Sequence, residues 1–171
     1  MIMEHPLVQL ARRTIGTYVK EGKTIEPPEE LSPEMKVRAG VFVSLHRQGK
    51  LRGCIGTFQP TAENVAQEII RNAIESCSRD PRFPPVGPEE LADLEISVDV
   101  LTDPVPVKSV KELDARKYGV IVKSGPRRGL LLPDLPGVNT PEEQISICRQ
   151  KAWIAEDEAV ELYRFEVRRF H

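Results

Sequence analysis

The sequence predicts an α+β fold, arranged as a single domain with two lobes over residues 1–171. Segments with helical periodicity alternate with segments of strand periodicity along the whole chain. A length of 171 residues is enough for one compact domain with a substantial core. The contents of 40% hydrophobic and 29% charged residues are typical of a globular protein. The 15 prolines gather between the periodic segments, so loops constrained by proline are expected to form a large share of the fold.

Three helices are predicted from apolar residues that recur every three or four positions. The first begins at Pro6, which suits a first helical turn, and ends before Gly22. The second covers 61–79 and carries an apolar stripe that ends at Cys77. The third opens at Thr140 with a capping box and continues through 152. These helices are expected to pack on the sheet.

Alternating or β-branched runs predict six strands, at 41–46, 51–58, 94–102, 119–123, 129–132 and 163–167. The first two are separated by four residues that include Gly49, so they are predicted to form an antiparallel hairpin. The helix at 61–79, between the second and third strands, is typical of a crossover connection. The fourth and fifth strands form another hairpin with a basic tip. Together these elements predict a mixed or antiparallel sheet.

The composition argues against membrane, nucleic-acid-binding and metal-binding roles. No apolar run approaches the ~20 residues of a membrane helix, and no charged and then apolar leader opens the sequence, so we expect a cytoplasmic chain with no membrane contact. The formal charge of −2 gives no overall attraction to nucleic acid. The three cysteines lack zinc-ligand spacing, and no carboxylate set supplies an alternative, so we expect reduced thiols and neither a metal nor a cofactor.

The segment with the most chemical content is Arg52-Gly53-Cys54-Ile55-Gly56-Thr57. In an extended strand Arg52 and Cys54 share one face, and a guanidinium beside a thiol favours the thiolate. Glycines inside a strand mark a close approach of backbone or ligand. The segment therefore predicts an anion-favouring site with Cys54 as a candidate nucleophile. The alternative is that Cys54 is a buried core residue, since none of the three histidines is obviously placed as its base.

The proline-rich loop at 80–85 is a second candidate. Each proline restricts the residue before it, so Asp80 and Phe83 are held in defined directions, with Arg82 between them. Such a loop positions a ligand, or it is fastened to the body by an ion pair between Asp80 and an arginine. Arg127 and Arg128 at the second hairpin tip form either an anion clamp or a solvated turn.

Two further side chains receive predictions. Asp99, on the polar side of the strand at 94–102, is expected to face solvent. Trp153 is expected to anchor the last helix, with stacking on a ligand as the alternative.

The hexapeptide at 52–57 resembles the signature of the AMMECR domain family, called AmmeMemoRadiSam system protein A in bacteria and archaea. Further similarities are Ser78-Arg79-Asp80-Pro81-Arg82-Phe83-Pro84-Pro85-Val86, Glu95-Ile96-Ser97-Val98, Arg128-Gly129-Leu130-Leu131-Leu132-Pro133 and Tyr163-Arg164-Phe165. The resemblance implies a two-lobed α+β fold with the hexapeptide in the interior or at the edge of a cleft between the lobes. It also implies a pathway shared with a Memo-type protein, similar to ring-cleaving dioxygenases, and a radical SAM protein.

The resemblance and the residues together predict a subunit or binding partner in that pathway, with a cleft that holds a small anionic ligand. The alternative is an enzyme in which Cys54 is the nucleophile or proton carrier, so the sequence leaves open whether the chain is an enzyme. A nucleic-acid-binding module is the least favoured reading, because the aromatic content of 5% leaves few rings for stacking on bases. The candidate catalytic residue is Cys54, and the candidate ligand-binding residues are Arg52, Gly53, Gly56, Thr57, Asp80, Arg82 and Phe83.

Overall fold

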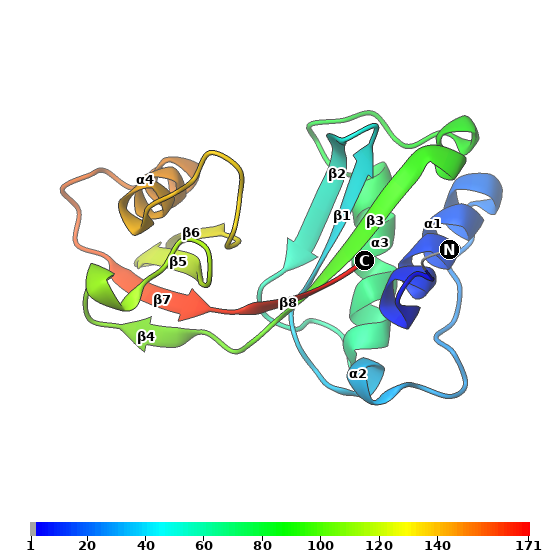
Figure 1. Cartoon of the computed structure of the whole chain (residues 1–171), viewed down its shortest axis with the longest axis horizontal. Coiled ribbons are helices and arrows are strands. Elements are labelled where there is room, and N and C mark those ends of the chain that lie inside the picture. The colour runs from blue at the N-terminus through cyan, green and yellow to red at the C-terminus, as the bar shows by residue number, and fades with distance from the viewer. Residues whose placement is uncertain (1–2) are drawn as a thin grey trace. The chain divides into compact units, whose positions relative to one another are not determined.

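The computed structural model describes residues 3–171 and confirms the α+β fold. The chain forms two compact units, which are described separately (Figure 1). Unit 1 contains residues 3–101 and 168–171, and unit 2 is Thr102–Val167. Each unit has its own sheet and its own buried core, where the sequence predicted one sheet for the whole chain. Among residues 3–171 no helix is long and apolar enough to cross a bilayer.

The sheet of unit 1 has the strand order β2-β1-β3-β8. Its strands are β1 (Val41–Arg47), β2 (Lys50–Thr57), β3 (Leu94–Leu101) and β8 (Val167–Phe170). Strand β1 pairs antiparallel with both β2 and β3, so β2 and β3 run in the same direction with β1 between them. The predicted crossover from β2 to β3 is therefore present, but it skips one strand. This order leaves β2 at an edge of the sheet.

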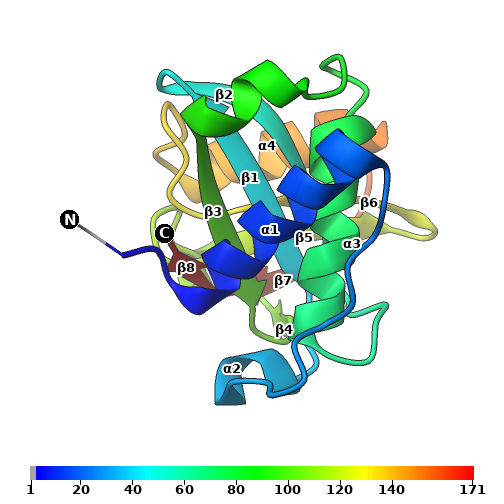
Figure 2. The same ribbon diagram turned by 90° about the vertical axis from the view of Figure 1, so that its right-hand side faces the viewer.

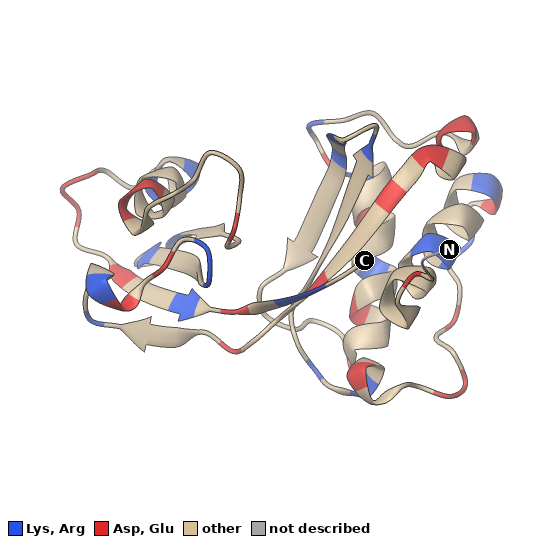
Figure 3. Cartoon of the chain, viewed as in Figure 1, with Lys and Arg blue, Asp and Glu red and all other residues tan. Residues whose placement is uncertain are grey.

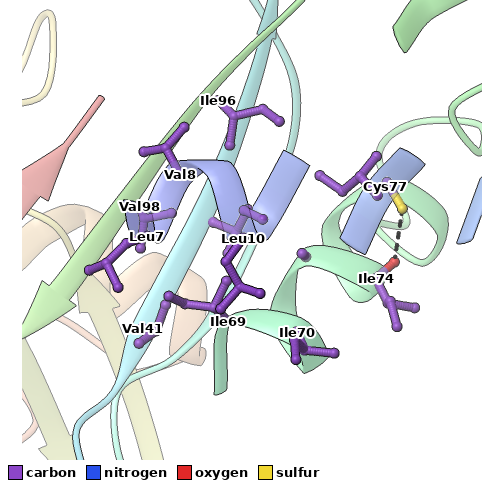
Figure 4. Close-up of a cluster of buried hydrophobic side chains, with 14 of the residues drawn as sticks. Leu7, Val8, Leu10, Val41, Ile69, Ile70, Ile74, Cys77, Ile96 and Val98 are labelled. Atoms are coloured by element: carbon purple, nitrogen blue, oxygen red, sulfur yellow. Dashed lines mark hydrogen bonds between the residues drawn. The ribbon is translucent and has the colours of Figure 1, made fainter. Parts of the chain in front are cut away.

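Helices α1 (Pro6–Glu21) and α3 (Val65–Ser78) lie across one face of this sheet (Figure 2), and the short α2 (Pro33–Lys36) packs against α3. His5 caps α1, because its Nδ1 accepts a hydrogen bond from the Leu7 N–H at 3.1 Å, and Gly22 ends the helix in the left-handed conformation. The core between the helices and the sheet is aliphatic (Figure 4). Its labelled members include Leu7, Leu10, Val41, Ile69, Ile96 and Val98.

Helix α3 begins at Val65, four residues later than predicted. The segment before it is held in a non-helical path by the buried carboxylate of Glu68. That carboxylate accepts hydrogen bonds from the backbone N–H groups of Thr61 (2.7 Å) and Ala62 (2.9 Å). Burial by itself would raise the pKa of Glu68, but these bonds outweigh it and the pKa is lowered. Glu68 therefore remains an ionised internal anchor.

Unit 2 is built on a sheet with the order β4-β7-β5-β6, in which the neighbouring strands pair antiparallel. The strands are β4 (Val105–Val107), β5 (Gly119–Ser124), β6 (Arg127–Leu131) and β7 (Glu161–Phe165). Helix α4 (Pro141–Ala152) packs on β5 and β6, with Cys148 buried between them. The short elements η1 (Pro88–Asp93), η2 (Val110–Glu112) and β4, and the break between β7 and β8, were not predicted.

Trp153 does not anchor α4, so this prediction is wrong. The residue follows the helix in a left-handed conformation (φ 59°), and its side chain is 87% exposed. Its neighbours Ala152 and Ile154 are buried in its place.

Strand β2 and helix α3 approach so closely at Gly53 that a side chain does not fit. A Cβ atom at Gly53 would overlap the carbonyl oxygen of Ser76. We expect Gly53→Ala to lower the free energy of unfolding by about 2 to 3 kcal/mol, because the helix must shift away from the strand. Gly16→Ala is the matched control. Gly16 lies within α1 with nothing near its Cβ position, so alanine there should stabilise the chain by about 0.5 to 1 kcal/mol. Calorimetric unfolding should show a loss of stability in Gly53→Ala and a gain in Gly16→Ala. Equal changes in stability in the two variants would contradict the predicted overlap.

Candidate functional site

A β-bulge at Arg52 decides the direction of the hexapeptide side chains. Leu45 of β1 pairs with Gly53, and His46 pairs with Leu51, so Arg52 is one extra residue without a partner. Gly53 faces α3, and Cys54 therefore lies on the opposite face of the sheet, beside Ser44. The prediction that Arg52 and Cys54 share a face is wrong, because the bulge breaks the strict alternation on which it relied.

Arg52 is engaged in an ion pair away from the Cys54 thiol. Its Nε donates to Glu90 Oε2 at 2.7 Å, and its Nη2 donates to Glu90 Oε1 at 3.1 Å and to the Pro85 carbonyl at 3.2 Å. These bonds hold the pKa of Glu90 below its usual value. The pairing fastens the loop after α3 to β2, and Arg52 does not supply the expected positive charge beside Cys54.

Every polar group of Cys54 has a partner. Its Sγ lies 3.2 Å from Ser44 Oγ, which comes from the facing position on β1. Its backbone N–H donates to Asp80 Oδ2 at 3.0 Å, and its carbonyl accepts from Arg82 Nη2 at 3.2 Å. Because β2 is an edge strand, these two side chains take the place of a neighbouring strand.

Burial raises the pKa of the Cys54 thiol, and the opposing effects of Ser44 and Arg82 are smaller. The expected thiolate is therefore not favoured. In the part of the chain that the structure describes, Ser44 is the side chain that hydrogen-bonds to Sγ, and no histidine is hydrogen-bonded to it. Cys54 is nevertheless half-buried, whereas Cys77 and Cys148 are fully buried.

Asp80 is the ionic centre of the site and is only 4% exposed. Besides the Cys54 N–H, its carboxylate accepts from the Arg82 backbone N–H at 3.1 Å, from Nε at 3.0 Å and from Nη2 at 2.8 Å. The hydrogen bonds from Arg82 hold the pKa of Asp80 far below its usual value. The 80–85 loop is thus fastened to the sheet, which is one of the two arrangements predicted for it.

Among the described charged groups that act on the Cys54 thiol, which are Arg82, Asp99 and Asp80, Arg82 is the one that reaches solvent. Its side chain is 54% exposed, and its guanidinium carbon lies 5.4 Å from the centre of the Phe83 ring. The bonds to Asp80 and Cys54 use Nε and Nη2. Nη1 makes none of these bonds, so it is the atom through which Arg82 could hold a ligand.

Gly56 and Thr57 take no part in the bonds that join Cys54, Asp80 and Arg82. The Phe42 ring covers Gly56, and a Cβ there would overlap it. Thr57 faces α3, where its Oγ1 donates to Glu68 at 2.9 Å and accepts from Asn72 at 3.1 Å. The structure therefore brings Cys54, Asp80, Arg82 and Phe83 together, and it leaves Arg52, Gly53, Gly56 and Thr57 in packing or supporting positions.

The face that carries Cys54 contains a residue group that the sequence analysis missed. Asp99 is 2% exposed and accepts from Arg169 Nε at 2.8 Å and Nη2 at 2.9 Å. The prediction that Asp99 faces solvent is wrong, because Arg169 of β8 covers it. The pairing partner lies 70 residues away in the sequence, so no local pattern could have indicated it.

Two other features do not extend the site. A groove of about 440 Å³ lies between α1, α3 and the segment after α1, but none of the predicted site residues lines it. At the second hairpin tip, Arg127 pairs with Glu158 and holds its pKa at about 2. Both terminal nitrogens of Arg127 are engaged, Nη1 by the Trp153 carbonyl and Nη2 by Glu158, so this guanidinium, unlike that of Arg82, is not an open anion clamp.

The comparisons with known proteins agree with the motifs. Residues 8–170 match the family model described as AMMECR1, which is nearly the whole described chain. The chain belongs to the AMMECR1 family. A Thermotoga maritima protein is 56% identical to this AMMECR1-family chain over 173 residues and matches along 99% of both chains. The crystal structure of uncharacterized protein PH0010 from Pyrococcus horikoshii superposes with a TM-score of 0.87 at 38% identity, covering 95% of this chain and 88% of that one.

A third AMMECR1 relative is a longer protein. Protein CA_C1420 of Clostridium acetobutylicum is 50% identical over 166 residues, which cover 96% of this chain but only 35% of that protein. The present chain thus spans about a third of that relative.

The Asp80 carboxylate should contribute strongly to stability. We expect Asp80→Asn to lower the free energy of unfolding by about 3 kcal/mol at pH 7, because it removes the charge that neutralises Arg82. The folded pKa of Asp80 lies below the unfolded one, so this contribution is complete above about pH 5 and declines progressively as the pH falls from about 4 toward the folded pKa. In denaturant unfolding, the difference in free energy of unfolding between wild type and variant should be smaller at pH 3 than at pH 7. Glu75→Gln, in an exposed ion pair with Arg79, is the control and should change stability by less than about 0.5 kcal/mol. A deficit that is equal at both pH values would contradict the ionic role.

The thiols should react slowly at neutral pH. Burial raises the pKa of Cys54, and it raises those of Cys77 and Cys148 to about 11 and about 12. Iodoacetamide labelling followed by peptide mass spectrometry should modify Cys54 before the other two, yet more slowly than a free cysteine peptide at pH 7. The rate at Cys54 should rise about tenfold for each pH unit up to pH 9. A rate above that of the free peptide would establish a lowered pKa and contradict this assignment.

Proposed function

We propose that this AMMECR1-family chain is a binding subunit of an assembly with a Memo-type protein and a radical SAM protein, and that it does not act through a Cys54 thiolate. The observation that carries the proposal is the state of Cys54. Its backbone groups are tied to Asp80 and Arg82, and burial raises the pKa of its thiol. Such a residue supports a recognition surface better than it supports nucleophilic attack, which requires an ionised thiol.

The anionic ligand of this proposal binds at Arg82. Arg82 presents its guanidinium to solvent beside Cys54, whereas Arg52 is engaged by Glu90. A guanidinium held in place by Asp80 loses little freedom when it binds a carboxylate or phosphate. The proposed ligand is therefore a small anion.

The length of the Clostridium acetobutylicum relative supports a role alongside another protein. In that relative the matching region is 35% of the chain, so this fold works there as one part of a larger protein. Acidic and basic residues are interspersed in both units (Figure 3), which gives no support to a nucleic-acid-binding role.

The enzyme alternative rests on one observation. Cys54 is the half-buried cysteine, and its Sγ contacts Ser44 Oγ at 3.2 Å, so a proton could pass between the two. In this alternative Cys54 is a proton carrier or nucleophile for a small anionic substrate. A faster alkylation of Cys54 than of a free thiol would favour it.

Co-purification tests the proposed assembly. The chain is mixed with the purified Memo-type and radical SAM proteins of the same genome at about 10 μM each, and complexes are separated by size-exclusion chromatography. We expect co-elution with at least one of them, with affinity retained in Cys54→Ser. Separate elution of all three proteins, confirmed by calorimetry without a binding signal, would refute the assembly. Loss of the complex in Cys54→Ser, with unfolding unchanged, would favour the enzyme alternative or a direct contact through the thiol.

A further inference from the structure

The groove beside α3 is formed by three segments of unit 1. Helix α1, helix α3 and the extended segment after α1 line a hollow of about 440 Å³. Figure 2 shows this segment passing along α3 on its way to α2. The volume lies in the range of small-molecule sites, about 300 to 1,000 Å³. None of the residues that bond to Cys54 lines this groove, so it is a second place where unit 1 can hold a ligand.

Apolar side chains from all three segments line the groove. Ile70 and Ile74 of α3 belong to the buried core, and Tyr18 of α1 and Ile25 of the extended segment are partly buried against that core. Pro27 also lines the groove and restricts the backbone of the extended segment. These contacts hold the apolar lining in place before any ligand arrives, which favours a ligand with an apolar portion.

Two side chains of opposite charge line the groove without an ion-pair partner. Arg71 of α3 donates from Nη1 to the neutral Thr61 hydroxyl at 2.8 Å. Within residues 3–171, neither Arg71 nor Glu26 forms an ion pair, either with the other or with a third group. The remaining charged residues of the groove, Arg79 and Glu75, pair with each other at 2.6 Å. The groove therefore presents one positive and one negative charge that a ligand can neutralise.

The backbone of the extended segment provides further acceptors. The carbonyl groups of residues 24–26 accept no hydrogen bond from any other residue in the range 3–171. Backbone carbonyls are obligatory acceptors, so these groups are left to water or to a ligand. An ammonium group has three donors to satisfy. The Glu26 carboxylate and the carbonyls of its own segment together supply enough acceptors for one ammonium group.

We propose that this groove binds a small zwitterion with an apolar body, the chemistry of an apolar α-amino acid. The ligand carboxylate pairs with Arg71, and its ammonium group pairs with Glu26 and the neighbouring carbonyls. Its apolar side chain packs against Tyr18 and Ile74. This inference goes beyond the proposed function and does not rest on it, since no residue around Cys54 takes part.

The charges of the groove argue against the other classes of small ligand. A phosphate or a dicarboxylate would bring two negative charges to a groove with one unpaired guanidinium, and it would be repelled by Glu26. An amine without a carboxylate would leave Arg71 without an opposite charge and would be repelled by it. A zwitterion is the small ligand that pairs with both groups.

Three related probes test the two charges separately. Leucine is titrated into the full chain by calorimetry, beside N-acetyl-leucine, which lacks the ammonium group, and leucinamide, which lacks the carboxylate. We expect leucine to bind about five- to tenfold tighter than either derivative, because each derivative loses one ion pair. In methyl NMR spectra leucine should shift the resonances of Ile70 and Ile74, while the indole resonance of Trp153 in unit 2 stays unchanged.

Variants assign each ligand charge to one side chain. Arg71→Gln should bind leucine and leucinamide with equal affinity, and Glu26→Gln should bind leucine and N-acetyl-leucine with equal affinity. A purely structural role of either residue would not produce this selective pattern. Arg13→Gln and Glu95→Gln are the matched controls. They remove the same charges from exposed positions of unit 1 outside the groove, so they should bind leucine as the wild type does.

Every other result would overturn the inference. Absence of heat and of methyl shifts at about 10 mM leucine would show that the groove holds no such ligand. Equal affinity of the wild type for all three probes would show apolar adsorption without charge recognition. Tighter binding of either derivative than of leucine would indicate the terminus of a peptide in place of a free zwitterion. Should Arg71→Gln lower the melting temperature, the three probes on the wild type and on Glu26→Gln decide the question. All of these results leave the proposed function untouched.

Discussion

One extra residue in an edge strand sets the arrangement of the candidate site. Because Arg52 is unpaired in the register between β1 and β2, Gly53 faces α3 and Cys54 faces the opposite side of the sheet. A strand without this bulge would direct the Arg52 charge to the thiol side. With the bulge, Arg52 bonds to Glu90 beyond α3, and the positive charge beside Cys54 comes from Arg82 in the following loop.

Two buried carboxylates then organise the segments around this strand. Glu68 accepts from the backbone of the segment before α3, and Asp80 accepts from β2 and from the loop after α3. In both cases hydrogen bonds to the charged oxygens offset the cost of burial and lower the pKa. A carboxylate can accept several N–H groups at once, which suits it to irregular backbone that no helix or strand satisfies.

Much of the fold could be predicted from local patterns, and the site could be predicted only in part. Pro6 and Gly22 mark the ends of α1, and the alternation over 94–101 marks β3, since these signals depend on neighbouring residues alone. The bulge at Arg52 could not be predicted, because a one-residue shift in pairing depends on β1. The exposure of Trp153 was missed for a similar reason: hydrophobicity predicts burial, and only the helix end at Ala152 determines the outward direction.

The loop at Asp80 also affects how the protein behaves with copies of itself. Strand β2 ends the sheet of unit 1, and an open strand edge is a template on which another chain can add a strand and start aggregation. At Cys54 both outward backbone groups are already occupied by Asp80 and Arg82. The side chains that shape the candidate site therefore also protect the edge at this point. Substitutions that release Asp80 and Arg82 from the strand would make the protein more prone to aggregate.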